Sequence, residues 1–377
     1  MKSIYYWSPF FSDIATEKAV LNSIIAIKKY SKNQFRPYLI NVFGEWDVHH
    51  EILKRYDIDI INFRLNNFFK KRKINGFLKS RVYQIKIFIL GFFPLLKILK
   101  KNKPDFIIIH LVTSLPLFIN FFFNLKTKFI LRISGLPKLN ILRNLYWKIV
   151  LDKINIITTP TVATKIYLKN LFPNLKISIL KDPIIFNETL FVKQKKKEKN
   201  NFYISIGRLT KQKNFLFLIK TFKKIIDKNS KNKLYILGDG EQYKKLYNYI
   251  KLNNLENNIF LKGYKKNIYN YLYSSKAFIL SSLWEDPGFV LVEAAYANIP
   301  IISSDCKNGP IEILNNGRNG YLFNSNNQDS LIHTINNFEN SNVKEILKKK
   351  IYAKKMSKNF SIFRHYIKLK KILEYIK

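Results

Sequence analysis

The chain contains a single cysteine, Cys306, among its 377 residues. One thiol cannot form an intrachain disulfide, and such low cysteine usage is typical of proteins in a reducing compartment. The N-terminal stretch MKSIYYWSPFFSD reaches Pro9 and Asp13 before the apolar core of a signal peptide could form. We therefore expect a cytoplasmic protein that is held together by packed cores rather than by cross-links.

Acidic residues are also scarce, since 25 Asp+Glu stand against 66 Lys+Arg and give a formal net charge of +41. The excess is spread evenly: residues 1–190 carry 31 Lys+Arg and 11 Asp+Glu, and residues 191–377 carry 35 and 14. Nucleic-acid-binding proteins usually gather their basic residues on one face or segment. The overall charge is therefore weak support for a basic nucleic-acid-binding protein, which stays as an alternative of a different class.

One block, residues 60–104, has no acidic residue at all. Its basic residues are mixed with phenylalanines and a Leu/Ile-rich run, a composition that suits an anionic membrane surface at about 1 kcal/mol per cation near the lipid. The alternative is a helix that packs on its own sheet with its lysine stems lying outward. We favour membrane contact and keep the structural alternative open.

Several nucleotide and metal motifs are missing. The chain has no G-x-x-x-x-G-K-[ST] sequence, and the turn with Gly238 and Gly240 lacks the third glycine of a dinucleotide-binding turn. No His, Cys and Asp residues have the spacing of metal ligands. We therefore expect neither a P-loop nor a bound metal.

The stretch 106–123 has 18 residues without a formal charge and approaches the length of a membrane span. We expect instead a buried strand up to His110 and then a helix with Pro116 in its first turn, because strands of a parallel sheet are apolar throughout.

Strand and helix patterns alternate along the chain, which predicts an α/β protein with two Rossmann-like domains and parallel sheets. A charged linker at 193–201 separates an N-terminal domain, 1–190, from a C-terminal domain, 200–360. A last helix at 361–376 is expected to return, with the tail to 377, to the first domain. Ligands of parallel sheets bind beyond the carboxyl ends of the strands. The expected strands are 3–7, 37–43, 57–62, 105–110, 128–133, 154–158, 202–206, 233–237, 258–261, 276–280, 299–303 and 320–323.

The stretch SLWEDPGFVLVEA (281–293) has the pattern strand, turn, helix. Glu285 lies in the turn and Glu293 a little over two helical turns later, on either side of an apolar run that contains Gly288. A glycine lets the backbone approach a ligand, and a helix that starts there directs free N–H groups at an anion. The stretch therefore suits an anion with hydroxyl groups on both sides, as in a sugar nucleotide.

A second stretch, YISIGRLTKQKNF (203–215), supplies positive charge. A buried strand ends at Gly207, Arg208 follows in the turn, and we place Lys213 in the first turn of the next helix. An arginine can bind a phosphate through two hydrogen bonds, and a lysine adds a compact charge. A solvated turn in a lysine-rich chain is the alternative, which the position beyond a buried strand makes less favourable.

In this order the two stretches resemble the donor-binding half of the retaining family 4 glycosyltransferases (glycosyl transferases group 1). The G-R-L-x-x-x-K pattern is Gly207 to Lys213, and the E-x7-E pattern is Glu285 to Glu293. The resemblance covers roughly residues 200–325 well and the first half weakly. It implies the GT-B fold, in which two Rossmann-like domains face a central cleft.

The resemblance also implies roles for single residues. Arg208 and Lys213 neutralise the leaving diphosphate, Glu285 touches the donor sugar and Glu293 holds the ribose. The nucleobase would lie near Gly263 and Tyr264, where a purely structural turn is as good an interpretation, and backbone groups of Gly288, Phe289 and Val290 assist at the sugar.

The first half departs from the family. The loop SPFFSDIAT (8–16) has no glycine pair, so contacts are expected around Ala15 and Thr16 instead. Ser134 stands where the family often has a histidine, and His110 is the nearest substitute. A lone histidine in such a place is more often structural.

The sequence as a whole predicts a hexosyltransferase that moves a sugar from a UDP- or GDP-sugar to an acceptor hydroxyl. By resemblance the configuration is retained, no metal or other cofactor is needed, and the acceptor is a lipid-linked saccharide in surface polysaccharide or lipopolysaccharide biosynthesis. We expect a peripheral protein on the inner face of the cell membrane. A sugar-nucleotide epimerase of the same fold is the alternative within this class.

Overall fold

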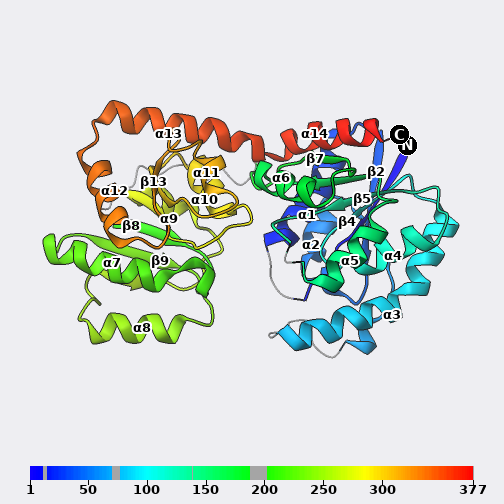
Figure 1. Ribbon diagram of the computed structural model, residues 1–377, viewed down its shortest axis with the longest axis horizontal. Coiled ribbons are helices and arrows are strands. Elements are labelled where there is room, and N and C mark those ends of the chain that lie inside the picture. Colours follow the sequence, from blue (N-terminus) through cyan, green and yellow to red (C-terminus); the bar gives the residue numbers. More distant parts are fainter. Residues whose placement is uncertain (12–14, 70–76, 138, 187–201, 377) are drawn as a thin grey trace. The chain divides into compact units, whose positions relative to one another are not determined.

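The computed structural model describes residues 1–11, 15–69, 77–137, 139–186 and 202–376. These residues form two compact units, Met1–Ile184 with Ser361–Lys377 and Ile185–Phe360. The linker predicted at 193–201 lies outside the described residues. Figure 1 shows the elements of each unit.

The first unit is built on a seven-stranded parallel sheet in the order β3-β2-β1-β4-β5-β6-β7. All pairings are parallel, as the apolar strand patterns predict. The strands are β1 (Lys2–Trp7), β2 (Phe35–Asn41), β3 (Asp59–Asn62), β4 (Phe106–Ile109), β5 (Lys128–Arg132), β6 (Ile156–Thr159) and β7 (Ile177–Ile179).

Helices cover both faces of this sheet. On one face, α3, α4 and α5 bury apolar side chains such as Ile87, Leu117 and Trp147 in one core. On the other face, α1 and α14 pack together, with the Tyr30 ring 5.2 Å from that of Phe363. The helices of this unit are α1 (Ala15–Tyr30), α2 (His50–Arg55), α3 (Phe77–Asn102), α4 (Ser114–Phe122), α5 (Ile141–Val150), α6 (Val162–Leu171) and α14 (Ile362–Tyr375).

The uncharged run 106–123 forms a buried strand and a helix, as predicted. β4 is fully buried, and Pro116 lies in the first turn of α4. Within the part of the chain that the structure describes, one helical segment, Arg81–Asn102 of α3, is long and apolar enough to cross a membrane, and 22% of its most apolar window is buried.

The second unit has a six-stranded parallel sheet in the order β10-β9-β8-β11-β12-β13. Its strands are β8 (Phe202–Ile206), β9 (Lys233–Leu237), β10 (Ile259–Leu261), β11 (Ala277–Leu280), β12 (Ile301–Ser304) and β13 (Tyr321–Phe323). The predicted fold class, two parallel-sheet α/β domains, is therefore confirmed.

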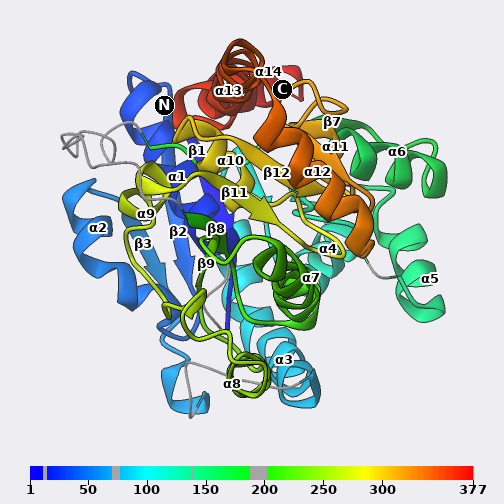
Figure 2. The same cartoon turned by 90° about the vertical axis from the view of Figure 1, so that its left-hand side faces the viewer.

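Helices of the second unit also lie on both faces of its sheet (Figure 2). α7 and α8 share a core with α12, and that core contains Phe222, Leu246 and Phe338. α10 packs against α13, which leads into α14 of the first unit. These helices are α7 (Phe215–Lys228), α8 (Tyr243–Leu252), α9 (Tyr269–Ser274), α10 (Phe289–Tyr296), α11 (Pro310–Ile313), α12 (Gln328–Asn340) and α13 (Val343–Ser357).

Candidate active site

The strand order of the second sheet defines where a ligand would bind. From β8 the chain moves to β9 and β10 on one side, then returns to β11 and continues to β12 and β13 on the other. The two connections leave the carboxyl ends of β8 and β11 in opposite directions, which opens a crevice at this topological switch point. The loops that border it are 207–214 and 281–288, the two stretches that the sequence singled out.

The loop after β8 presents Arg208 to solvent and buries the next residue, Leu209, as an anchor. Lys213 ends a 3-10 turn, Lys211–Lys213, and α7 begins only at Phe215. The expectation that Lys213 lies in the first turn of that helix is therefore wrong. Asn214, between the turn and the helix, takes a left-handed conformation (φ 54°) that starts the helix after the lysine rather than before it.

Lys213 and Glu285 meet across the switch point. The Nζ of Lys213 lies 2.6 Å from Oε1 of Glu285, and their side chains are 14% and 4% exposed. Ser282 donates a second hydrogen bond to the same carboxylate oxygen. Both bonds therefore fall on Oε1, and Oε2 has no partner among the residues that the structure describes. A loop glutamate is usually solvated, so the burial of Glu285 and the role of Ser282 were not foreseen.

Three further hydrogen bonds hold the two loops together. The Leu283 N–H donates to the Gln212 carbonyl at 2.9 Å, and the Gln212 side-chain amide donates to the Trp284 carbonyl at 2.9 Å. The Ser281 hydroxyl donates to the Lys213 carbonyl at 2.9 Å. The ion pair is thus held by backbone contacts on both sides, which is the preorganisation that a binding site for charge requires.

Gly288 connects this cluster to α10. Its backbone has φ +96°, and a Cβ added there would lie 3.4 Å from Cγ of Glu285. α10 begins at Phe289, as predicted, and Phe289 is half-buried while Val290 is buried. The first N–H groups of a helix have no carbonyl partner within it, so this end of α10 directs donors outward beside Glu285.

Glu293 lies farther along α10 and is half-buried, although Val290, Leu291, Val292 and Ala294 around it are buried. Burial, and then the Glu293 charge, raise the pKa of the Tyr269 phenol. Glu293 therefore lies near Tyr269 of α9.

The loops after β9 and β10 press against the loop after β8. A Cβ added to Gly238 would lie 1.9 Å from the Gly207 carbonyl oxygen, so only glycine fits there. The Gly238 N–H donates to the Gly263 carbonyl at 2.9 Å. Gly263 itself has open space around it, and the next side chain, Tyr264, is 75% exposed. An exposed ring beside an open glycine can stack on a planar group.

Cys306 lies under the same cluster. Burial raises the pKa of its thiol to about 12, so the thiol stays protonated at neutral pH. Among the described residues, no three His, Cys, Asp or Glu side chains are grouped so that they could hold a metal ion.

The first unit has a buried polar cluster of its own, at the end of β4 and β5. Arg132 pairs with Asp182 at 2.6 Å, and both side chains are almost fully buried. Burial, with the charge of Arg132 and then His365, lowers the pKa of His110. His110 Nδ1 has no hydrogen-bond partner among the described residues. His110 is thus a buried neutral histidine, while Ser134 is half-buried. Of the loop 8–16, residues 12–14 lie outside the described residues, and Ala15 and Thr16 begin α1.

His365 attaches α14 to this cluster. Its Nδ1 lies 2.8 Å from the Lys181 carbonyl, which only accepts, so Nδ1 carries the proton. Its Nε2 then accepts from the Ser23 hydroxyl at 2.8 Å. Burial is the main reason that the pKa of His365 falls to about 3.

Several known glycosyltransferases are similar to this chain. Residues 186–359 match the family described as Glycosyl transferases group 1. An uncharacterized glycosyltransferase of Methanocaldococcus jannaschii is 37% identical over 246 residues, which are 59% of this chain and 61% of that protein. A UDP-Gal:alpha-D-GlcNAc-diphosphoundecaprenol alpha-1,3-galactosyltransferase of Escherichia coli is 33% identical over 177 residues, 46% of this chain and 45% of the relative. The chain thus spans less than two thirds of the length of these relatives.

Among solved structures, the Anabaena protein HepE in complex with UDP superposes with a TM-score of 0.73 at 14% identity, covering 100% of both chains. At this identity the likeness shows the fold alone. Residues 186–359 are thus similar to the glycosyl transferases group 1 family, and the chain has the two-domain fold of the GT-B glycosyltransferases.

Proposed function

We propose that the protein is a retaining glycosyltransferase that moves a hexose from a nucleoside-diphosphate sugar to an acceptor hydroxyl. The observation that carries the proposal is the Lys213–Glu285 ion pair, which joins the two loops at the switch point of the second sheet. A cation and a carboxylate held side by side at this point can bind the diphosphate and the sugar of one donor molecule, respectively.

The diphosphate would bind between Arg208, Lys213 and the start of α10. Arg208 is exposed and has no ion pair with any described residue, so its guanidinium is available to a ligand. Lys213 has one ammonium hydrogen directed at Glu285 and two that can turn to a phosphate. Charge that develops on the leaving diphosphate would be stabilised by these cations and by the N–H groups of Phe289 and Val290. We propose that no metal is needed for this step.

The sugar would lie against Glu285, whose Oε2 can accept a hydrogen bond from a hydroxyl group. Glu293, farther along α10, would accept from the ribose hydroxyls, and the exposed Tyr264 ring beside Gly263 would contact the base. If the acceptor hydroxyl forms its bond to the anomeric carbon on the same face from which the diphosphate departs, the anomeric configuration is kept. We assign no protein nucleophile to this step.

We propose a lipid-linked saccharide as acceptor, in surface polysaccharide synthesis, because the Escherichia coli relative is named for a diphosphoundecaprenol-linked acceptor. The surface of the first unit supports a membrane partner. Along α3 the side chains of Val82, Ile85, Ile89 and Phe93 form an exposed apolar stripe at spacings of three and four residues. Ile141 and Leu142 of α5, on the same face of the sheet, are also exposed.

Basic residues accompany this stripe, among them Lys86, Lys97 and Lys100, each exposed on α3. Apolar side chains that enter the lipid boundary beside cations that meet anionic headgroups are the features of a helix lying in a membrane surface. We therefore place the protein on the inner face of the cell membrane. Residues 70–76 of the basic block lie outside the described residues.

The proposal is tested by incubating the protein with a panel of UDP- and GDP-sugars and a prenyl-diphosphate-linked saccharide. We expect diphosphate release with one donor and, by proton NMR, a product with the anomeric configuration of that donor. Turnover should persist in the presence of a chelator. An inverted product would contradict retention, and loss of turnover on chelation would contradict metal independence. If every donor is left intact, the transferase proposal fails.

A further inference from the structure

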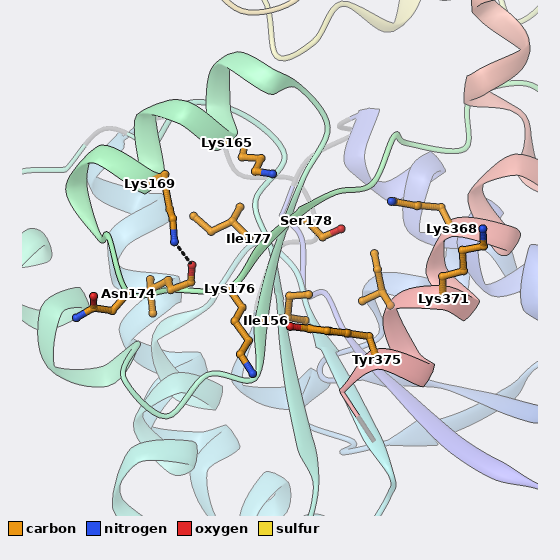
Figure 3. A pocket seen from close by; sticks show the side chains of 12 residues that line it. Ile156, Lys165, Lys169, Asn174, Lys176, Ile177, Ser178, Lys368, Lys371 and Tyr375 are labelled. Atoms are coloured by element: carbon orange, nitrogen blue, oxygen red, sulfur yellow. Dashed lines mark hydrogen bonds between the residues drawn. The ribbon is translucent and has the colours of Figure 1, made fainter.

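A lysine-rich pocket lies in the first unit, far along the chain from the candidate active site. It has a volume of ≈ 510 Å³ and is bordered by α6, β7 and the second half of α14. Figure 3 shows its lining. A volume of this size is typical of small-molecule sites.

The charge of the pocket has one sign. Five of its lining residues are lysines and none of its twelve lining residues is acidic: the lysines are Lys165, Lys169, Lys176, Lys368 and Lys371. The nearby carboxylate on α14, Glu374, does not line the pocket and lies 3.9 Å from Lys370. Five ammonium groups around one hollow repel one another, and this repulsion is relieved if an anion binds.

Two of the lysines already have contacts. Lys169 donates to the carbonyls of Pro173 and Leu175, and the Lys176 ammonium lies 5.6 Å from the centre of the Tyr375 ring. The ammonium groups of Lys165, Lys368 and Lys371, in contrast, have no hydrogen bond or ion pair with any described residue. Their ammonium groups are therefore the ones available to a ligand.

The side chains of the pocket are arranged so that several of them can contact one ligand. Lys165 from α6 and Lys368 from α14 extend from opposite sides toward Ser178 of β7 (Figure 3). The hydroxyl of Ser178 can donate to the same anion. Ile156, Ile177 and Ile372 provide an apolar floor beneath them.

We propose that this pocket binds a polyvalent phosphate, either free or carried on an apolar chain. Lysine ammonium groups are compact charges that suit phosphate oxygens, and two of them on opposite sides of a hydroxyl match a group with several oxygens. The apolar floor can accept the carrier of a phosphate ester. Nothing in this site is shared with the loops at the switch point of the second unit, so the two sites can be tested separately.

Binding would join α14 to α6 and β7, because Lys368 and Lys165 would contact one ligand. A ligand that binds only the folded protein raises its stability by mass action. The second half of α14 is therefore the region whose stability should respond most.

Calorimetric titration of the full chain tests the proposal, with tripolyphosphate as the free probe and farnesyl diphosphate as the apolar-chain probe. The ionic strength is matched with sodium chloride. The variant Lys165→Ala/Lys368→Ala should bind the effective probe at least about 10-fold more weakly, because it removes two charge-assisted contacts to the phosphate. Lys344→Ala/Lys348→Ala, which removes two exposed lysines of α13, is the matched control and should bind as the wild type does.

The two probes separate the sources of the phosphate. Binding of tripolyphosphate indicates a free polyanion, and binding of farnesyl diphosphate alone indicates a phosphate on an apolar carrier. The proposal is overturned if neither probe binds, or if the Lys165/Lys368 variant binds as tightly as the control. UDP affinity of that variant should equal the wild-type value, so failure here is distinguishable from failure of the proposed glycosyl transfer.

Discussion

At the residue scale, Lys213 and Glu285 depend on one another for stability. Glu285 is buried and receives the Lys213 ammonium at 2.6 Å. Removal of one partner from a buried ion pair leaves an uncompensated charge, which is more costly than removal of both.

A double-mutant cycle measures this dependence. Lys213→Met alone should lower the free energy of unfolding by about 3 kcal/mol, because it leaves the Glu285 carboxylate buried without its cation. Glu285→Gln alone should cost less, since Lys213 is the more exposed partner. The double variant should be more stable than Lys213→Met. Additive effects in chemical denaturation would show that the two side chains do not interact.

The glycines of the site give a second test at this scale. Gly238→Ala would place Cβ against the Gly207 carbonyl, so we expect severe loss of stability or failure to fold. Gly263→Ala is the matched control, because nothing lies within 4 Å and only its left-handed conformation (φ +68°) opposes the change. That strain costs about 1–2 kcal/mol. Equal melting temperatures of the two variants would contradict the close packing of the loops.

At the element scale, the strands were predictable and the side-chain geometry of the site was not. Twelve expected strands lie within two residues of those observed, because buried parallel strands are continuous apolar runs. β7 was missed, since its three residues are only half-buried at the sheet edge and follow Pro173. Lys213 was placed in the wrong element because the left-handed Asn214 delays α7, a local conformation that no periodicity reveals.

The candidate site was likewise predictable in its loops but not in its side-chain contacts. The residue types and the order of the motifs identified the two loops. The pairing of Glu285 with Lys213 and Ser282 depends on β8 and β11 being neighbours in the sheet, although 72 residues separate the two partners of the ion pair. Sheet order is a property of the whole unit and cannot be read from either stretch alone.

The attachment of α14 gives a pH prediction. His365 has a pKa of about 3 in the folded unit, below the ordinary value of 6.5. Its folded pKa is depressed, so its contribution to stability is complete above about pH 6.5 and is lost as the pH falls toward 3. Between these limits the slope is up to about 1.4 kcal/mol per pH unit.

His365→Asn keeps a donor for the Lys181 carbonyl and removes the titration. We therefore expect the melting temperature of this variant to fall less steeply than that of the wild type between pH 6.5 and 5. His50→Asn, at an exposed histidine of α2, should leave the wild-type slope unchanged. Parallel curves for wild type and His365→Asn would indicate that His365 titrates outside this range.

At the scale of the whole molecule, the high net charge and the apolar stripe of α3 should act together. Screening shortens the Debye length from about 10 Å at 0.1 M salt to about 3 Å at 1 M, so binding to anionic vesicles should weaken as salt rises. Part of the binding should persist, because the stripe buries apolar surface whatever the salt.

Vesicle sedimentation at low and high salt measures the salt-sensitive and the salt-resistant part of the binding. Ile89→Ser/Phe93→Ser should remove the salt-resistant part and leave the salt-sensitive part. Val343→Ser/Leu347→Ser, which removes two exposed apolar side chains of α13, is the matched control and should bind as the wild type does. Wild-type binding that is equal on neutral and anionic vesicles would contradict the electrostatic part, and tight, salt-resistant binding to duplex DNA would favour the nucleic-acid alternative.

The central claim is that the loops after β8 and β11 bind a nucleoside diphosphate. Calorimetric titration of UDP and GDP into the wild type, Arg208→Ala and Lys211→Ala tests it most directly, since both side chains are exposed on the same loop and neither substitution disturbs a buried group. We predict that one nucleotide binds the wild type, that Arg208→Ala weakens it about 10- to 100-fold through loss of a charge-assisted phosphate contact, and that Lys211→Ala leaves it unchanged. Equal affinity in all three proteins, or no binding of either nucleotide to the wild type, would contradict the claim.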